Sequence, residues 1–309
     1  MDKIERVRAA LGGKPPDRPP FTIWYHFGTQ QSAASLTAQV HLEFFETYDL
    51  DLLKLMNDYD YPMPAGLDAI RTPADLARLQ PFDPADTPLA AQLQVVELVA
   101  RALRGKALFL DTVFNAWNTL KRNLVKGAIT TLMAEHPEAV ETALHVVNQN
   151  LIRYARASLE RGAAGIFLSV PASAESLTRE RYERFMRPFD LELLAAIRDR
   201  GECHVLHAHG EKLYLDRLLD YPVHALSWAD LNGGPSIAEM RARTPLTLMT
   251  GLDHVAFAEL AAPAIGDQAK RAVAEAGGTR FILAPGCSVP TYSYPPLIRA
   301  ARAAVGGST

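Results

Sequence analysis

The stretch CHVLHAHGEKLYLDRLLDYPVHALSWAD, residues 203–230, contains one complete unit of the fold. Two short, mainly apolar runs, CHVLHAH (203–209) and HALSWAD (224–230), flank a segment whose apolar residues recur at helical spacing. A strand, a helix and a strand in this order are typical of parallel pairing, because two parallel strands need a crossover connection. The unit therefore predicts an α/β protein built on a parallel sheet.

The same alternation continues in both directions along the chain. Six further runs have the length and composition of strands: FTIWYHF (21–27), DLLKLMN (51–57), ALFLDTVF (107–114), GIFLSV (165–170), LTLMTGLD (246–253) and RFILAPGC (280–287). Helical periodicity fills the segments between them, most clearly over residues 87–104, 136–163 and 178–201. Eight strands alternating with helices predict a (β/α)8 TIM barrel that forms a single domain over residues 1–309.

An open, doubly wound parallel sheet is the alternative that this alternation allows. Such a sheet would need a glycine-rich phosphate-binding turn after an early strand, and neither G-x-G-x-x-G nor G-x-x-x-x-G-K-[ST] occurs in the chain. The closed barrel is therefore the leading interpretation. Two segments fall outside it. The Pro-rich residues 60–88 are predicted to form an excursion over the barrel that acts as a lid, and residues 305–309 a frayed tail.

The composition is that of a soluble globular protein, with 48% hydrophobic and 22% charged residues. A formal net charge of −3 and a pI of about 6.3 provide no field that would attract nucleic acid or an anionic membrane. The chain has two cysteines, Cys203 and Cys287, which excludes a disulfide scaffold and favours a reducing compartment. We find neither a secretory signal nor an apolar run long enough to span a membrane, and we expect a cytoplasmic protein.

Polar side chains cluster at the carboxyl ends of the predicted strands, where the active sites of (β/α)8 barrels lie. We expect catalytic roles for Asp58, His26 and Asp230, and substrate contacts from Tyr25, Asn57, Asn115, Trp228 and Asp253. His26 suits acid–base catalysis because the pKa of imidazole lies near neutrality. Each of these residues also has a structural alternative, such as a helix cap, a hydrogen-bonded core group or, for Trp228, packing in the core.

The sharpest combination is His207, His209 and Cys287. Side chains two residues apart on a strand point to the same face, so both histidines can face the barrel interior. Cys203 shares that face but lies roughly 13 Å lower, at about 3.3 Å per residue, and is predicted to be a core residue. Two imidazoles and a thiolate can bind zinc and leave a fourth position open. The alternative is that the histidines hydrogen-bond a ligand or the backbone and that Cys287 is a small buried residue.

Several segments, taken in order, resemble the uroporphyrinogen decarboxylase superfamily, which includes the corrinoid-dependent methyltransferases. They are RVRAALGGKPPDRPP (6–20), GIFLSVPASAESLTRERYERFMRPFDLELLAAIR (165–198), HAHGEKLYLDRLLDYPVHALSWAD (207–230), TGLD (250–253) and FILAPGCSVPTYSYPPLIRAA (281–301). The resemblance implies a (β/α)8 barrel, in agreement with the independent count of strands.

The two branches of this superfamily differ in their motifs. Uroporphyrinogen decarboxylases carry an M-R-Q-A-G-R segment after the first strand and a G-H-G near the last, where this chain has IWYHFGTQQ (23–31) and Pro285-Gly286-Cys287. Asp58, in NDYDYP (57–62), matches a pyrrole-binding aspartate of that branch. The methyltransferase branch binds zinc through an H-x-C pair and a late Cys. The resemblance therefore implies zinc on His207 and Cys287, with His209 in place of the middle cysteine.

The leading hypothesis is a zinc-dependent methyltransferase that moves a methyl group between a corrinoid (cobalamin) or another methyl carrier and a thiol-type acceptor. The resemblance implies a separate corrinoid protein and a homodimer as partners, beside a small-molecule substrate. A metal-free decarboxylase of a tetrapyrrole or a smaller carboxylic acid is the second hypothesis. The third is a non-catalytic module that binds a corrinoid or a porphyrin.

Overall fold

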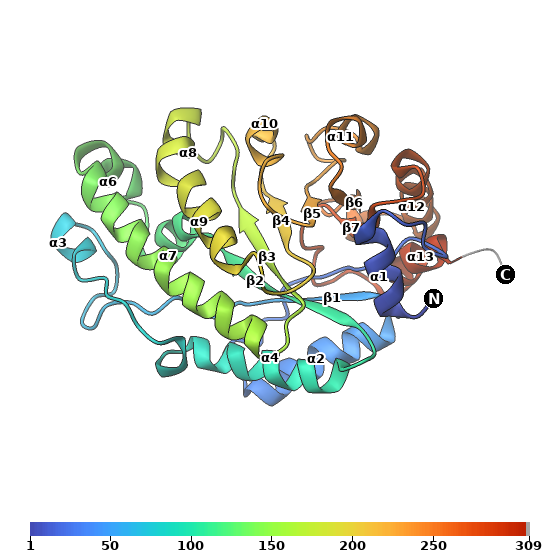
Figure 1. The fold of residues 1–309 in the computed structure, drawn as a ribbon, viewed down its shortest axis with the longest axis horizontal. Helices are drawn as coiled ribbons and strands as arrows, with labels where there is room; N and C mark the ends of the chain where they lie inside the picture. The colour runs from blue at the N-terminus through green and yellow to red at the C-terminus, as the bar shows by residue number, and fades with distance from the viewer. Residues whose placement is uncertain (307–309) are drawn as a thin grey trace.

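The computed structural model describes residues 1–306 and contains one parallel sheet of seven strands in sequential order (Figure 1). The sequential order means that each strand pairs with the next one along the chain, as in an α/β barrel. The strands are β1 (Leu52–Leu55), β2 (Leu108–Phe114), β3 (Gly165–Val170), β4 (Val205–Ala208), β5 (Ala225–Ser227), β6 (Thr247–Leu252) and β7 (Phe281–Pro285). These seven confirm the α/β class and seven of the eight predicted strands.

The prediction of an eighth strand over residues 21–27 was wrong, and the sheet is not closed by a regular ladder. Phe21 forms a single parallel bridge with Leu283 of β7, and its carbonyl accepts a hydrogen bond of 2.9 Å from the backbone N–H of Asp51, just before β1. Phe21, at the start of residues 21–27, thus lies between the two edge strands, β7 and β1. Beyond it, Tyr25 and Phe27 pack against Phe44 of α2 (Ala34–Thr47) with ring centroids 4.9 and 5.3 Å apart. This packing directs the chain toward the helix layer instead of along the seam.

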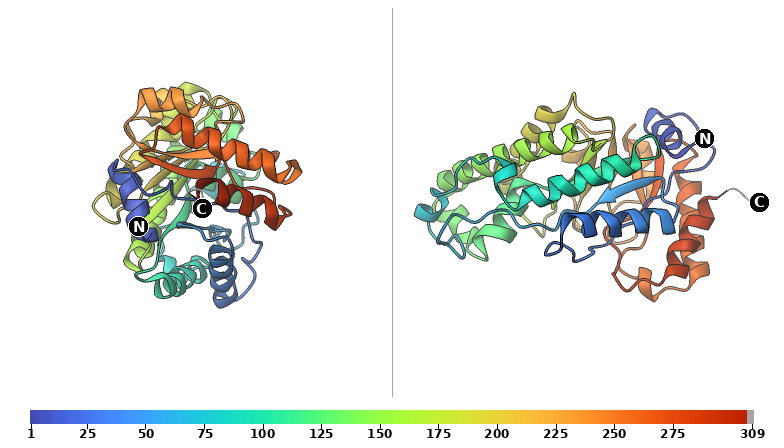
Figure 2. Two further views of the ribbon diagram at one scale, coloured as in Figure 1. Left: turned by 90° about the vertical axis from the view of Figure 1, so that its right-hand side faces the viewer. Right: turned by 90° about the horizontal axis from the view of Figure 1, so that it is seen from below.

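Helices cover the outer face of the curled sheet, and α2 and α4 (Leu89–Leu103) lie side by side below it (Figures 1 and 2). The predicted helix over 178–201 is split into α8 (Arg179–Phe185) and α9 (Arg187–Ile197), because Pro188 has no N–H to continue the helical hydrogen bonds. The other helices are α1 (Lys3–Gly12), α3 (Pro73–Leu76), α5 (Ala116–Thr119), α6 (Ile129–Glu135), α7 (Pro137–Glu160), α10 (Leu215–Leu218), α11 (Ile237–Arg243), α12 (Ala262–Ala276) and α13 (Pro295–Val305). Short helical turns occur at Pro84–Asp86, Leu120–Val125 and Phe257–Glu259.

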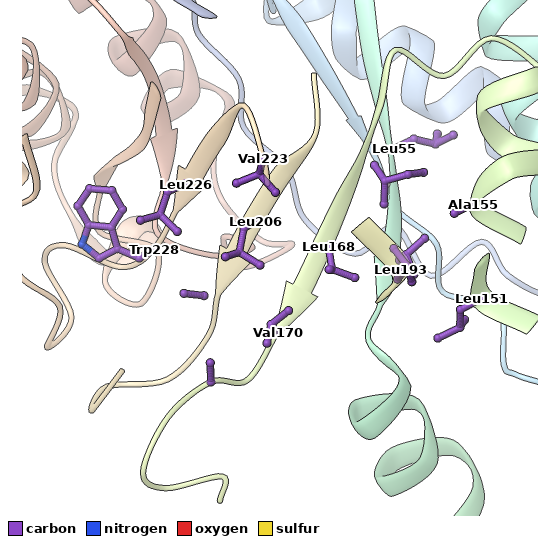
Figure 3. Close-up of a cluster of buried hydrophobic side chains, with 14 of the residues drawn as sticks. Leu55, Leu151, Ala155, Leu168, Val170, Leu193, Leu206, Val223, Leu226 and Trp228 are labelled. Carbon is purple, nitrogen blue, oxygen red and sulfur yellow. The ribbon is translucent and has the colours of Figure 1, made fainter. Parts of the chain in front are cut away.

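Alternate residues of each strand contribute to two separate apolar cores, as the period of two requires. The outer core lies between the sheet and the helices, where Leu55 and Leu168 lie near side chains of α7 and α9, and Leu206 lies beside Val223 and Leu226 (Figure 3). The inner core contains Leu52, Leu110, Phe167, Val205, Met249 and Ile282, together with Val7 and Ala10 of α1.

Helix α1 packs against the amino-terminal end of the sheet. Its Ala10 carbonyl accepts a hydrogen bond of 3.1 Å from the hydroxyl of Thr247, the first residue of β6. Because α1 covers this end of the inner core, a ligand can approach the interior from the carboxyl ends of the strands.

The Pro-rich residues 60–88 join β1 to α4 and are mostly irregular, with α3 and one 3-10 turn. Tyr61 and Phe82 of this segment pack together, and the Tyr61 hydroxyl accepts a hydrogen bond of 2.7 Å from Asn150 of α7. Its role as a lid stays a prediction. Of the predicted tail 305–309, Val305 ends α13, and residues 307–309 lie outside the described residues. Within residues 1–306, no helix has both the length and the apolar character needed to cross a bilayer.

Candidate functional site

A cavity of about 170 Å³ lies at the carboxyl ends of β4, β5 and β7 and is lined by all three predicted metal ligands. Its walls are His207, Ala208, His209, Gly210, Glu211, Ala229, Asn232, His254, Val255, Gly286 and Cys287. A larger depression of about 540 Å³ lies between the Pro-rich segment and α7. Its lining holds no histidine or cysteine, so we assign the chemistry to the smaller cavity.

His207 is held firmly on the inner face of β4. Its Nδ1 lies 3.1 Å from the hydroxyl of Ser227 on β5, and its ring stacks on Phe167 with a centroid distance of 5.1 Å. Burial lowers the pKa of His207, so the imidazole is neutral at pH 7. When Nδ1–H donates to Ser227, the lone pair of Nε2 is left free for a ligand.

His209 follows the last residue of β4, two residues beyond His207, and the two ring centroids are 6.3 Å apart. Its side chain is more exposed, and burial still lowers its pKa. Both histidines border the same cavity, and their role as metal ligands stays a prediction. Two neutral imidazoles border one cavity.

Cys287 follows the end of β7 and is half-buried. The preceding Gly286 allows this turn, because a Cβ at that position would lie 2.6 Å from the Cα of Ala229. The same Cβ would lie 3.1 Å from Nδ1 of His254, a buried atom without a hydrogen-bond partner in the described part of the chain. The sequence assigned no role to His254, which the structure places in the cavity wall.

The donor set is chemically suited to zinc, although it is not preassembled. Among residues 1–306, no three His, Cys, Asp or Glu side chains are already placed closely enough to hold a metal ion. Two imidazoles and one thiol are nevertheless favourable zinc ligands. The unpartnered Nδ1 of His254 adds a further nitrogen donor in the same wall. Binding of a metal would require these side chains to close around it.

Lys54 is a buried charged residue that the sequence analysis missed. It points into the barrel from β1, between Leu52 and Met56 of the inner core, and its side chain is 3% exposed. Its ammonium lies 4.8 Å from the ring centroid of Phe167 and 5.4 Å from that of Trp24. A lysine within the apolar run DLLKLMN, in phase with the inward residues, was the signal that could have revealed it.

His26 and Asp58 form a pair at the barrel mouth, with Nδ1 and Oδ1 2.6 Å apart. His26 is about half exposed, at 48%, and Asp58 is 19% exposed. The structure therefore joins two of the three predicted catalytic residues, although neither belongs to the lining of the His207 cavity. Tyr25 packs beside this pair against Phe27 and Phe44.

Asn57 and Asn115 face the helix layer. Nδ2 of Asn57 donates to the Tyr154 hydroxyl of α7 at 3.2 Å, and Oδ1 of Asn115 caps α5 through the N–H of Asn118. Nδ2 of Asn115 donates to Asp190 of α9 at 2.8 Å. These contacts stabilise the fold and leave both predicted substrate-binding residues outside the cavity wall.

The pairing of Asn115 with Asp190 leads to a pH-dependent prediction. Burial raises the pKa of Asp190 to about 7, against an unfolded value of about 3.9. Between about pH 4 and pH 7 the folded state binds more protons than the unfolded state, so stability falls as the pH rises. D190N should remove this dependence, and its Tm relative to wild type should increase by about 5 °C or more from pH 4 to pH 7. A constant Tm difference across this range would contradict the prediction.

Trp228, Asp230 and Asp253 also have structural contacts. Trp228 lies in the outer core (Figure 3), and its Nε1–H donates to the Pro235 carbonyl at 2.9 Å. Asp230 accepts hydrogen bonds from the Thr250 hydroxyl at 2.7 Å and from Arg271 of α12 at 2.8 Å.

Asp253 accepts backbone N–H bonds from Val255 and Ala256 and a side-chain bond from Asn232, at 2.9–3.0 Å. It therefore supports the loop that carries His254, while Asp230 and Trp228 anchor the sheet to the helices. None of the three lines the cavity.

The comparisons with known proteins agree with this architecture. The family model of uroporphyrinogen decarboxylase (URO-D) matches residues 56–306. A methyltransferase from Methanosarcina mazei has a similar structure, with a TM-score of 0.83 and 18% identity over 98% of each chain. A B12-independent methionine synthase from Shewanella sp. W3-18-1 has a TM-score of 0.63 and 9% identity, over 93% of this chain and 92% of that chain.

At these identities the two structures show a shared fold. A search of curated proteins found no match. The family model covers most of the chain and includes β2 to β7, whereas β1 (Leu52–Leu55) ends just before it begins. On this ground, the protein belongs to the uroporphyrinogen decarboxylase family.

Proposed function

We propose that the protein is a zinc-dependent methyltransferase that moves a methyl group between a corrinoid, or another methyl carrier, and a thiol-type acceptor. The observation that carries the proposal is the single cavity lined by His207, His209 and Cys287. Family membership supports it, and so does the fold shared with a methyltransferase and a methionine synthase. A small-molecule acceptor suits a cavity of about 170 Å³.

The residues of the chain would prepare this site in two ways. Ser227 and Phe167 fix the ring of His207, and burial keeps both imidazoles neutral, so that they can act as ligands. Zinc, when bound, would lower the pKa of the acceptor thiol. The enclosed cavity would then orient the sulfur toward a methyl carrier at the barrel mouth, which favours in-line displacement.

The identity of the donors affects the chemistry that we expect. Two neutral imidazoles and one thiolate leave a formal charge of +1 with Zn²⁺, whereas an H-x-C pair and a second cysteine would leave none. A more positive centre stabilises an acceptor thiolate more strongly and makes it less nucleophilic. We therefore propose an acceptor whose thiol needs a strong Lewis acid to lower its pKa.

A metal-free decarboxylase of a smaller carboxylic acid is the second candidate, and Lys54 favours it. Carboxylate substrates need a cation, and the sequence offered none near residues 23–31. The structure places the ammonium of Lys54 inside the barrel, close to the rings that support His207. This candidate predicts activity without bound metal.

Metal analysis distinguishes the two functions. We expect purified, folded protein to contain about one zinc ion per chain and to transfer a methyl group from methylcobalamin to a thiol. The zinc should be removable by chelators and restored by added Zn²⁺, with activity following the metal content. Fully folded protein with less than about 0.2 zinc per chain after incubation with Zn²⁺ would contradict the methyltransferase proposal and favour the decarboxylase.

A further inference from the structure

The other buried charges of the described chain have partners of opposite charge or several hydrogen bonds. Asp51 pairs with Arg6 and Arg18, at 2.7 and 2.6 Å. Asp230 pairs with Arg271 at 2.8 Å. Asp111 accepts hydrogen bonds from Tyr154 at 2.6 Å and from Ser158 at 2.8 Å, and Asp190 accepts them from Asn115 and Tyr221 at 2.8 and 3.1 Å.

Lys54 differs from all of these. Within residues 1–306, its ammonium has no carboxylate at ion-pair distance, and its hydrogen-bond partner is the thioether of Met56. An ammonium has three N–H donors, and a thioether is a weak acceptor. Burying such a group without an oxygen partner destabilises a fold. A residue that costs stability without a structural partner is a candidate for a functional role.

The ammonium lies next to the candidate site. Phe167 and Trp24 contact both Lys54 and the ring of His207, so Lys54 and His207 lie against the same two aromatic rings. Burial lowers the pKa of Lys54 to about 7, and Cys287 is the first of the groups that oppose this shift, followed by Asp58 and Asp111. Through these two rings Lys54 lies close to His207, which lines the cavity, although Lys54 itself is not part of the lining.

We propose that Lys54 is a specificity-determining residue that binds the anionic end, a carboxylate, of the small molecule that occupies the cavity beside His207 and Cys287. The carboxylate would supply the oxygen acceptors that the ammonium lacks. Charge-assisted hydrogen bonds of this kind are the strong ones in proteins. The inference rests on the proposed function for its ligand class, which is a thiol that also carries a carboxylate.

The first test measures stability without a ligand. K54M keeps the length and apolar character of the side chain and removes the charge. At pH 6.0, where Lys54 is mostly protonated, K54M should raise Tm by about 3 °C or more. K106M, which removes an exposed ammonium before β2, is the matched control and should leave Tm unchanged. A lower Tm for K54M than for K106M would mean that the ammonium holds the fold together, and it would overturn the proposal.

The second test measures binding by calorimetry, with mercaptoacetate and its neutral isostere mercaptoacetamide. Wild type and K106M should prefer the carboxylate by at least about 10-fold, and K54M should lose this preference. K54Q, which is polar and neutral, repeats the comparison if K54M does not fold. An equal preference in wild type and the Lys54 variants would overturn the proposal.

The design separates this inference from the proposed function. Acetate and acetamide lack the thiol. Because zinc can also bind a carboxylate, their ratio of affinities is compared between wild type and K54M, which differ at Lys54 alone. A wild-type protein that binds no zinc but prefers acetate over acetamide in a Lys54-dependent way would support the inference and contradict the methyltransferase. A protein that binds zinc, and that binds charged and neutral thiols equally well, would support the methyltransferase and contradict the inference.

Discussion

C287A should lower the zinc content from about one ion per chain to below about 0.2 and remove methyl transfer. Cys287 is the only sulfur donor in the cavity wall, and its loss would leave the imidazoles of His207, His209 and His254 without an anionic ligand. Loss of a residue that merely supports a ligand costs about 10–100-fold in metal affinity, so loss of the ligand itself should exceed about 100-fold. Metal analysis after dialysis, and competition with a chromophoric chelator, measure this effect.

Cys203 provides the matched control. It is buried in the inner core of the same barrel and contributes nothing to the cavity wall. C203A should therefore retain zinc and activity while it loses some stability through the small cavity it leaves. If C287A bound zinc as tightly as C203A, Cys287 would be no ligand, and the proposal of a metalloenzyme would fail.

D51N should lower the free energy of unfolding by about 3 kcal/mol or more, the largest stability effect that we expect from one polar substitution. The Asp51 carboxylate is fully buried, and it accepts hydrogen bonds from Arg6 at 2.7 Å, from Arg18 at 2.6 Å and from the N–H of Phe21 at 2.9 Å. It thereby ties α1 and the segment before residue 21 to the start of β1. An amide would leave the buried guanidinium of Arg6 and the partly buried guanidinium of Arg18 without their shared anion.

Urea unfolding of D51N and of D49N tests this prediction. Asp49 is 55% exposed and also binds two cations, Lys3 and Arg302, so it matches Asp51 in chemistry but not in burial. An exposed pair contributes at most about 1 kcal/mol, and D49N should fall within that limit. Similar losses in the two variants would show that burial does not decide the energy of these ion pairs.

The alternation of side chains along each strand predicts which strand-end residues face the cavity and which face the helices. It predicted that His207 on β4 and His209 just after it point the same way, and both line one cavity. The same count places Asn57, Trp228 and Asp230 on the outward face of their strands, where the structure finds them among the helices. A polar residue at a strand end is a candidate ligand contact only if this phase also points its side chain inward. The phase would also have singled out Lys54 as an inward-facing cation.

The sequence by itself determined the seven strands, their order and the face to which each side chain points, because these follow from local periodicity and from short connections. Tertiary structure alone decided three matters: that residues 21–27 leave the seam to pack on α2, that Cys287 turns into the same cavity as the histidines, and that Lys54 has no anionic partner among residues 1–306. Each depends on atoms that are distant in the chain, and a periodic pattern contains no information about which of them meet.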